Sequence, residues 1–386
     1  MKQFRKVVFW LHLISGVTAG IVIFIMSVTG ALLSFEKNII EYAEREMRFV
    51  AVPENAHKLF VQEILSKTLV AKPEAKPSAI TVQNTANAAV NVALGRDGQV
   101  FVNPYTGEIT GEGAKNVRGF FRTVTDFHRW LAMSGDGRFI GKAITGACNL
   151  LFLLLAVSGI YIWFPRRLSR RHFKPVLWFR RGLQGKARDF NWHNVIGFWS
   201  SLVLIILTVT ASVISYQWAG NLIYTLTGNE PPQPQQSQPN ASNQAVESPF
   251  ILPENLDQIW ILAENQANWK SISMRLPVTK DAAVFTIDEG KYWNIFARST
   301  LTIDPKNAEI VKWESYGEQN SARQLRSWFR FTHTGETGGI IGQFIGFLAC
   351  VGGAFLVWTG LSLAWRRFRG WLTQSKKDFE PQLNND

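Results

Sequence analysis

The sequence has few of the residues that build disulfide frameworks or zinc sites. Only two cysteines occur in 386 residues, Cys148 and Cys350, and each lies inside a long apolar run. A disulfide framework needs cysteines in external segments, and a zinc site needs closely spaced Cys and His ligands, so neither is expected. The C-x-x-C-H motif is also missing, which excludes the usual covalent attachment of a c-type heme.

Nucleotide motifs and acidic residues are scarce as well. The chain has no G-x-G-x-x-G fingerprint and no other recognisable flavin site, so an electron donor would be a separate molecule. Twenty-nine Asp and Glu stand against 41 Lys and Arg, which gives a net charge of +12. Because the basic residues cluster beside apolar runs, the charge indicates membrane topology and attraction to anionic membrane lipid, and no nucleic-acid partner is expected.

Four apolar runs are long enough to cross a membrane. A hydrocarbon core of about 30 Å takes roughly 20 helical residues. The runs lie near residues 7–35, 140–164, 195–218 and 340–365. They predict an α-helical integral membrane protein with four transmembrane helices.

The distribution of basic residues predicts the orientation of these helices. In residues 165–194, between the second and third runs, nine basic residues precede the first acid, Asp189. Basic residues also flank the first run within residues 1–35 and follow the last run in residues 366–386. Since cytoplasmic loops carry an excess of Lys and Arg, both termini and the 165–194 loop are expected in the cytoplasm.

The two remaining segments, 36–139 and 219–339, are therefore external. Each contains strand-like runs and a turn initiated by Asn103-Pro104 or Asp304-Pro305. Each segment is predicted to form a small α+β domain. Residues 229–249 are rich in Pro, Gln, Ser and Asn and are predicted to be a disordered external loop.

The chain also repeats itself. Three matches are separated by 201 residues: Asn103 with Asp304, Gly141 with Gly342, and Ser158-Gly159 with Thr359-Gly360. Three others are separated by 181 residues: His12 with His193, Gly16 with Gly197, and Ser27-Val28-Thr29-Gly30 with Thr208-Val209-Thr210-Ala211. A duplicated unit of helix, external domain and helix accounts for this pattern. The two copies begin on the same side, so a pseudo-twofold axis along the membrane normal is expected.

Four of the six histidines fall into this repeat. His12 and His193 lie just inside the cytoplasmic ends of the first and third spans, whereas His128 and His333 lie just before the second and fourth spans on the external side. A twofold axis brings equivalent side chains together, and one imidazole on each face of a porphyrin makes a bis-histidine heme. The pattern predicts two b-type hemes, with these four histidines as axial ligands of the iron.

Neighbouring residues fit this hypothesis. Arg129 and Arg330 lie close to the external histidines and are candidates to pair with heme propionates. A single histidine near a membrane interface is more often a snorkelling polar residue than a ligand, but four at two depths in a duplicated frame favour ligation. His57 and His172 have no repeat partners and are expected to be surface residues.

Both halves together resemble the PepSY-associated transmembrane family. The resemblance rests on the histidine pairs, the S/T-V-T-G/A stretch in the first and third spans, and the turn at residues 103–109, which is similar to the family's N/D-P-x-T-G-x pattern; the second copy lacks the Thr-Gly pair. It implies PepSY-like external domains and a bacterial inner-membrane protein of iron uptake, such as a reductase of ferric siderophores of the ferrioxamine type.

The expected activity follows from combining the heme sites with this resemblance. Electrons from a cytoplasmic or quinol donor would enter at the inner heme, pass to the outer heme, and reduce an iron(III) siderophore in the periplasm to release iron(II). Two alternatives remain open. One is an iron or siderophore permease, although the spans contain no obvious coupling-ion site. The other is a membrane-anchored regulatory or binding protein, which leaves the paired histidines unexplained.

Overall fold

The computed structural model describes residues 2–164, 170–232, 252–279 and 281–379. The predicted disordered loop lies outside the described residues from residue 233 onward. The chain forms two compact units. The helical unit comprises Met1–Glu36, Phe121–Gly220 and Phe329–Asp386, and the sheet unit comprises Lys37–Phe120 and Asn221–Trp328.

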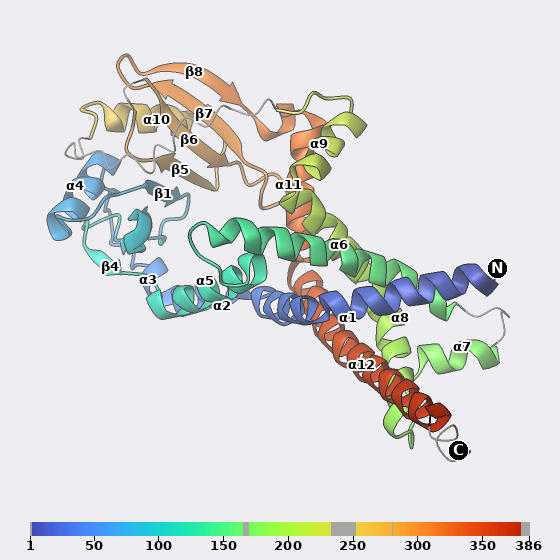
Figure 1. The fold of residues 1–386 in the computed structure, drawn as a ribbon. Coiled ribbons are helices and arrows are strands. Elements are labelled where there is room, and N and C mark those ends of the chain that lie inside the picture. Colours follow the sequence, from blue (N-terminus) through green and yellow to red (C-terminus); the bar gives the residue numbers. More distant parts are fainter. Residues whose placement is uncertain (1, 165–169, 233–251, 280, 380–386) are drawn as a thin grey trace. The chain divides into compact units, whose positions relative to one another are not determined.

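The helical unit contains four long helices, α1 (Lys2–Leu33), α6 (Gly137–Trp163), α8 (Gly185–Ser215) and α12 (Gly339–Phe379) (Figure 1). Each is long and apolar enough to cross a membrane, which confirms the four predicted spans. Large apolar side chains on their outer faces are exposed, including Ile21 at 71% and Leu202 at 68%. Such a surface suits lipid rather than water, and the chain is a multi-pass membrane protein.

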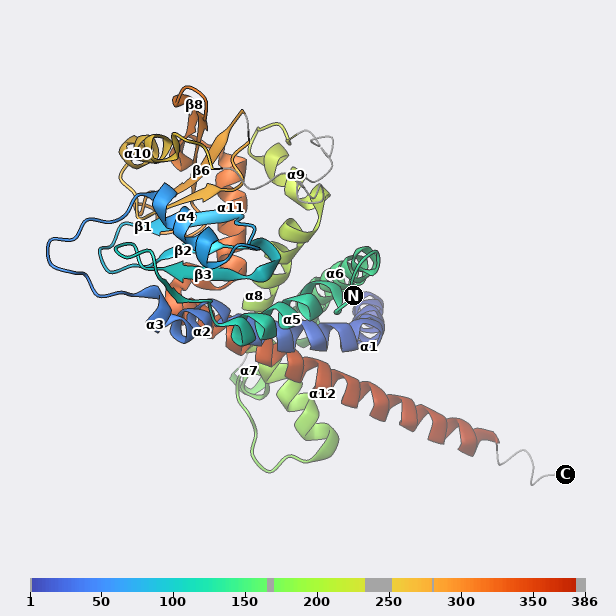
Figure 2. The same ribbon diagram turned by 90° about the vertical axis from the view of Figure 1, so that its left-hand side faces the viewer.

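Two of these helices are longer than the apolar runs that predicted them. The helix α8 begins at Gly185, ten residues before the predicted span, and α12 continues through the predicted cytoplasmic tail to Phe379. Figure 2 shows α12 extending past the other helices of its unit toward the C-terminus. Hydropathy detects only the part of a helix that lies in hydrocarbon, whereas Lys, Arg and Gln continue a helix readily in water.

The four helices pack in a ring. The helix α1 packs against α6 and α12, and α8 packs against the same two helices, so α1 and α8 are diagonally opposite. Glycines allow close approach at several contacts; a Cβ at Gly20 would lie 3.4 Å from Leu361 of α12. The short helices α5 (Lys115–Trp130) and α11 (Ser321–His333) precede α6 and α12, and α7 (Arg170–Leu177) packs on α8.

The sheet unit is built on one antiparallel sheet of eight strands in the order β4-β3-β2-β1-β5-β6-β7-β8 (Figure 1). The strands are β1 (Ala79–Gln83), β2 (Val90–Ala93), β3 (Gln99–Val102), β4 (Ile109–Gly111), β5 (Ser271–Arg275), β6 (Ala283–Asp288), β7 (Ser299–Asp304) and β8 (Glu309–Glu314). Residues 36–139 supply β1–β4 and residues 219–339 supply β5–β8. The two segments expected to form separate small domains therefore share one sheet.

The seam between the segments lies at the centre of this sheet, where β1 pairs with β5 over five residues. Thr81 donates a hydrogen bond to Ser273 across the seam at 2.9 Å. The helices α4 (Val61–Ala71) and α10 (Leu256–Gln266) also meet, and Asp257 accepts a hydrogen bond from the Gln62 backbone at 2.9 Å. Pairing β1 with β5 removes two exposed strand edges, which explains why neither segment stands alone.

One hydrophobic core runs under both halves of the sheet. Alternate strand residues such as Ile80, Val92 and Phe285 are fully buried in the same cluster as Leu65 of α4 and Ile259 of α10. The alternation is the period of two expected for a sheet with one covered face. Three further helices are α2 (Glu36–Ala43), α3 (Arg45–Arg48) and α9 (Gln217–Leu226).

A buried carboxylate links several elements of residues 36–139 by hydrogen bonds. Glu44, which is fully buried between α2 and α3, accepts hydrogen bonds from Arg48 at 2.8 Å, from Arg118 of α5 at 2.8 Å and from the Ala114 backbone at 3.1 Å. Burial raises the pKa of this carboxyl, but these hydrogen bonds outweigh burial and hold the pKa below its usual range. The ionised group therefore ties three elements together.

Candidate functional site

The inner pair of histidines lies on the two diagonally opposite helices, His12 on α1 and His193 on α8. Their imidazole centroids are 6.4 Å apart, their ring planes are inclined by 83°, and both rings are half-buried. Two imidazoles on opposite sides of one iron, each with a metal–nitrogen bond of about 2 Å, have centroids roughly 6.3 Å apart. The observed spacing fits a single iron between His12 and His193.

Each inner histidine is held through its Nδ1 atom by a hydroxyl on the next helix. The Nδ1 of His12 lies 2.8 Å from Ser158 Oγ on α6, and the Nδ1 of His193 lies 2.9 Å from Thr359 Oγ1 on α12. A glycine follows each hydroxyl residue. A Cβ at Gly360 would lie 3.3 Å from Cε1 of His193, so the glycine leaves room for the ring.

The outer histidines are held in the same manner. His128, near the end of α5, has its Nδ1 2.9 Å from Thr29 Oγ1 on α1, and His333, the last residue of α11, has its Nδ1 3.1 Å from Thr210 Oγ1 on α8. A Cβ at Gly30 would lie 3.4 Å from Cε1 of His128. Burial and, to a smaller extent, the charge of His333 lower the pKa of His128 to about 4. Both outer imidazoles are thus near one another and neutral at pH 7.

The two levels of histidines are regularly spaced along the diagonal helices. Seventeen residues separate His12 from the outer hydroxyl residue Thr29 on α1, and seventeen separate His193 from Thr210 on α8. At about 1.5 Å per residue, each interval spans roughly 25 Å, which is close to the thickness of the hydrocarbon core. The two pairs therefore occupy opposite ends of the four-helix ring.

The direction of the hydrogen bonds follows from the second contact of each hydroxyl. Three of the hydroxyls donate to a carbonyl one turn earlier in their own helices: Thr29 to Ile25 at 2.6 Å, Thr210 to Ile206 at 2.7 Å and Thr359 to Phe355 at 2.7 Å. Ser158 donates to Leu155 at a longer 3.3 Å. A hydroxyl has one proton, so it accepts from the imidazole Nδ1–H. This tautomer leaves the Nε2 lone pair for a metal.

These donors fit heme better than a bare metal ion. Across the described ranges, no three His, Cys, Asp or Glu side chains gather in a group that could hold a metal ion. Two neutral imidazoles alone suit a metal whose remaining ligands come from a macrocycle. The residues that would hold two such groups are His12 with His193 and His128 with His333.

The arginines proposed to meet heme propionates lie near their histidines. Arg129 is exposed, with its guanidinium 4.6 Å from the centre of the Trp130 ring, and Arg330 is exposed on α11 three residues before His333. At the inner end, Arg188 binds the buried Asp189 at 2.9 Å, and Arg366 of α12 approaches the same carboxylate at 3.5 Å. Pairing of Arg129 and Arg330 with propionates stays a prediction.

Sequence reasoning missed the four hydroxyls as functional residues. Ser158, Thr359, Thr29 and Thr210 were recognisable only as repeat markers, because nothing in a sequence shows which helix a histidine faces. A usable signal was present nonetheless. Each of the four hydroxyl residues is followed by Gly or Ala. Of the two unpaired histidines, His57 is exposed as expected, and the side chain of His172 lies outside the described residues.

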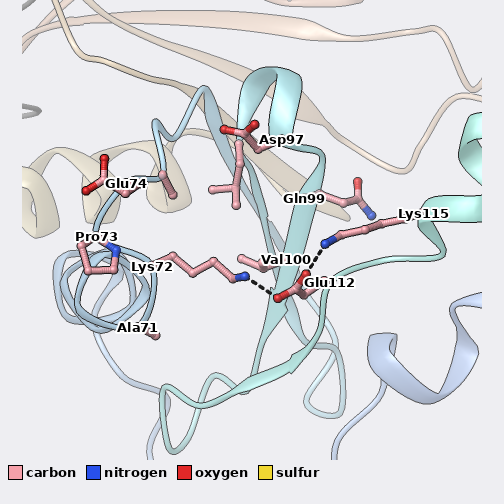
Figure 3. A pocket seen from close by; sticks show the side chains of 11 residues that line it. Ala71, Lys72, Pro73, Glu74, Asp97, Gln99, Val100, Glu112 and Lys115 are labelled. Carbon is pink, nitrogen blue, oxygen red and sulfur yellow. Dashed lines mark hydrogen bonds and ion pairs between the residues drawn. The ribbon is translucent and has the colours of Figure 1, made fainter.

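The sheet unit has a polar hollow of about 460 Å³ beside the end of α4 (Figure 3). Lys72 and Lys115 line it, and both ammonium groups pair with Glu112. Hydrogen bonds from these two lysines lower the pKa of Glu112 to about 2. Two further acids, Glu74 and Asp97, also line the hollow, which contains none of the residues that sequence reasoning selected.

Comparison with known proteins agrees with the helical architecture. A family model described as the PepSY-associated TM region matches residues 9–367. The matched range contains all four paired histidines and the four hydroxyls that hold them. A search of curated proteins finds no match.

Proposed function

The chain belongs to the PepSY-associated transmembrane family, and from this premise we propose that it is a di-heme reductase of the bacterial inner membrane. In this proposal both termini are cytoplasmic, and electrons cross the membrane to reduce an iron(III) siderophore in the periplasm and release iron(II). The donor is a quinol or a cytoplasmic reductase, and the substrate is of the ferrioxamine class that the family resemblance implies.

One observation carries the proposal: His12 and His193 face each other at 6.4 Å with both Nδ1 atoms bound to hydroxyls. Heme iron held by two imidazoles supplies one-electron transfer and has no open coordination position. The residues of this chain provide the remaining requirements. Their hydroxyls bind Nδ1 of each imidazole, which leaves Nε2 for a metal, and the outer pair lies about 25 Å away along the helices.

The stoichiometry of the reaction follows from the substrate. Each iron(III) chelate takes one electron and becomes an iron(II) chelate, and a two-electron donor such as a quinol would therefore reduce two chelates. Hard oxygen ligands bind iron(II) less strongly than iron(III) because its charge is lower. Reduction thus weakens the chelate without any bond to the protein.

The proposal is tested by following electrons from the purified, dithionite-reduced protein to a ferric hydroxamate siderophore under anaerobic conditions. Oxidation of the protein's hemes should match, one for one, the iron(II) captured by a chromogenic chelator. His12→Ala should abolish turnover with a cytoplasmic-side donor in vesicles, while the exposed-residue control His57→Ala should not. Vesicles that take up iron(III) siderophore without forming iron(II) would support the permease alternative instead.

A further inference from the structure

We infer that Ser158, Thr359, Thr29 and Thr210 are positioning residues that fix the Nδ1–H tautomer of the four histidines and thereby set the reduction potentials of the two sites. The inference rests on the proposed function. We further infer that the loss of the Ser158 hydroxyl affects its site more than the loss of the Thr210 hydroxyl.

The hydroxyl proton of each threonine is already used in a hydrogen bond to its own helix. Thr29, Thr210 and Thr359 donate to their own helices at 2.6 to 2.7 Å, so each presents only a lone pair to its histidine. A hydrogen bond accepted from Nδ1–H makes the imidazole a stronger donor at Nε2. A stronger donor favours iron(III) over iron(II), so each hydroxyl is expected to lower the reduction potential of its site.

The imidazole rings differ in the hydrogen-bond partners of their Nδ1 atoms. His333 also donates to the Leu207 carbonyl at 3.1 Å. A backbone carbonyl can only accept, so the His333 ring keeps its tautomer when the Thr210 hydroxyl is removed. For His12, the partner that the described part of the chain supplies is Ser158.

Ser158 differs from the three threonines in its own hydrogen bond too. Its hydroxyl lies 3.3 Å from the Leu155 carbonyl, whereas the threonine hydroxyls lie within 2.7 Å of theirs. Within the described residues, His12 depends on a single hydroxyl, whereas His333 also donates to the Leu207 carbonyl. The inner site should be the one whose potential responds most to loss of its hydroxyl.

A merely structural role for these residues makes a different prediction. Ser and Thr that bond back to their own helix affect helix bending, and removing them changes packing without reference to a ligand. Ser201 of α8 provides the matched control, because it is half-buried and donates to the Phe198 carbonyl at 3.1 Å. Ser201→Ala and Ser158→Ala remove the same atom from similar surroundings.

The experiment is an optical redox titration of the full-length protein with its hemes, comparing Ser158→Ala, Ser158→Thr, Thr210→Val and Ser201→Ala. The inner component is identified as the one that His12→Ala removes. Ser158→Ala should weaken the preference of the inner site for iron(III) about tenfold, which raises its potential by about 59 mV. Ser158→Thr and Ser201→Ala should match the wild type, and Thr210→Val should shift the outer potential by less, because Leu207 still accepts from His333.

If Ser158→Ala loses the inner heme outright, retention of that heme by Ser158→Thr supports the same inference, since only the hydroxyl is common to serine and threonine. An inner potential unchanged in Ser158→Ala, or a shift in Thr210→Val as large as in Ser158→Ala, would overturn the inference while leaving a two-heme protein intact. A colourless wild type would overturn the proposed function and the inference with it.

Discussion

His12 and His193 face each other across the four-helix ring with their imidazole planes 83° apart and their centroids 6.4 Å apart. They come from diagonally opposite helices that pack against the same two neighbours, and Ser158 and Thr359 on those neighbours hold the two Nδ1 atoms. The pair is therefore a preorganised gap of fixed width. The centroid spacing is close to the roughly 6.3 Å expected for two imidazoles bound to one iron.

Removing one ligand should empty one site only. We expect His193→Ala to reduce the heme content from two per chain to one and to leave the outer site spectrally unchanged, because the two pairs are about 25 Å apart. His333→Ala should do the reverse. Pyridine hemochrome assay with protein quantification measures the ratio. Loss of both hemes from either variant would show that the pairing by depth is wrong.

The glycine beside His193 should not tolerate a branched side chain. A Cβ at Gly360 would lie 3.3 Å from Cε1 of His193, so Gly360→Val is expected to displace the imidazole and release the inner heme. Gly346 lies in the same helix with open space around its Cβ position, and Gly346→Ala is the control. Absorption spectra of the two purified variants provide the comparison; equal spectra would mean that Gly360 gives no room to the ligand.

The buried Glu44 should stabilise the sheet unit in a pH-dependent manner. Because its folded pKa is lowered, the stabilisation is present above the ordinary carboxyl value of 4.5 and is lost as the pH falls through the folded pKa. Glu44→Gln is expected to cost about 3 kcal/mol at pH 7, since Arg48 and Arg118 lose their shared partner.

Chemical unfolding of the full chain in detergent at pH 7 and at pH 4 measures this cost. The difference between Glu44→Gln and wild type should shrink at the lower pH. The neighbouring Glu46, whose side chain is 86% exposed, supplies the control Glu46→Gln, for which a change below about 0.5 kcal/mol is expected. A pH-independent cost at Glu44 would mean that its charge contributes nothing.

The seam between β1 and β5 should make the two external segments unfold together. Ser273→Pro removes a backbone donor from a central strand and is expected to cost about 3 kcal/mol or more. Hydrogen exchange followed by mass spectrometry should then show faster exchange in β1–β4 as well as in β5–β8. Faster exchange confined to residues 252–314 would indicate two independent domains.

Hydropathy and charge were sufficient to predict the four spans, because a hydrocarbon core imposes a length and a composition that each run shows on its own. The pairing of β1 with β5 was not predictable in the same way, since an edge strand of one segment carries no sign of its partner in another. The histidines could be selected from the repeat, whereas their hydroxyl partners Ser158 and Thr359 required knowledge of which helix faces which. The tautomer depends on a further contact, the bond from each hydroxyl to its own helix.

We propose that one iron sits between His12 and His193 and a second between His128 and His333. Electron paramagnetic resonance of the oxidised full-length protein, together with its heme-to-chain ratio, tests this most directly. We expect two hemes per chain, both low-spin with two imidazole ligands, and loss of one low-spin signal in His12→Ala. A folded protein without heme, or hemes that are high-spin and five-coordinate in the wild type, would contradict it.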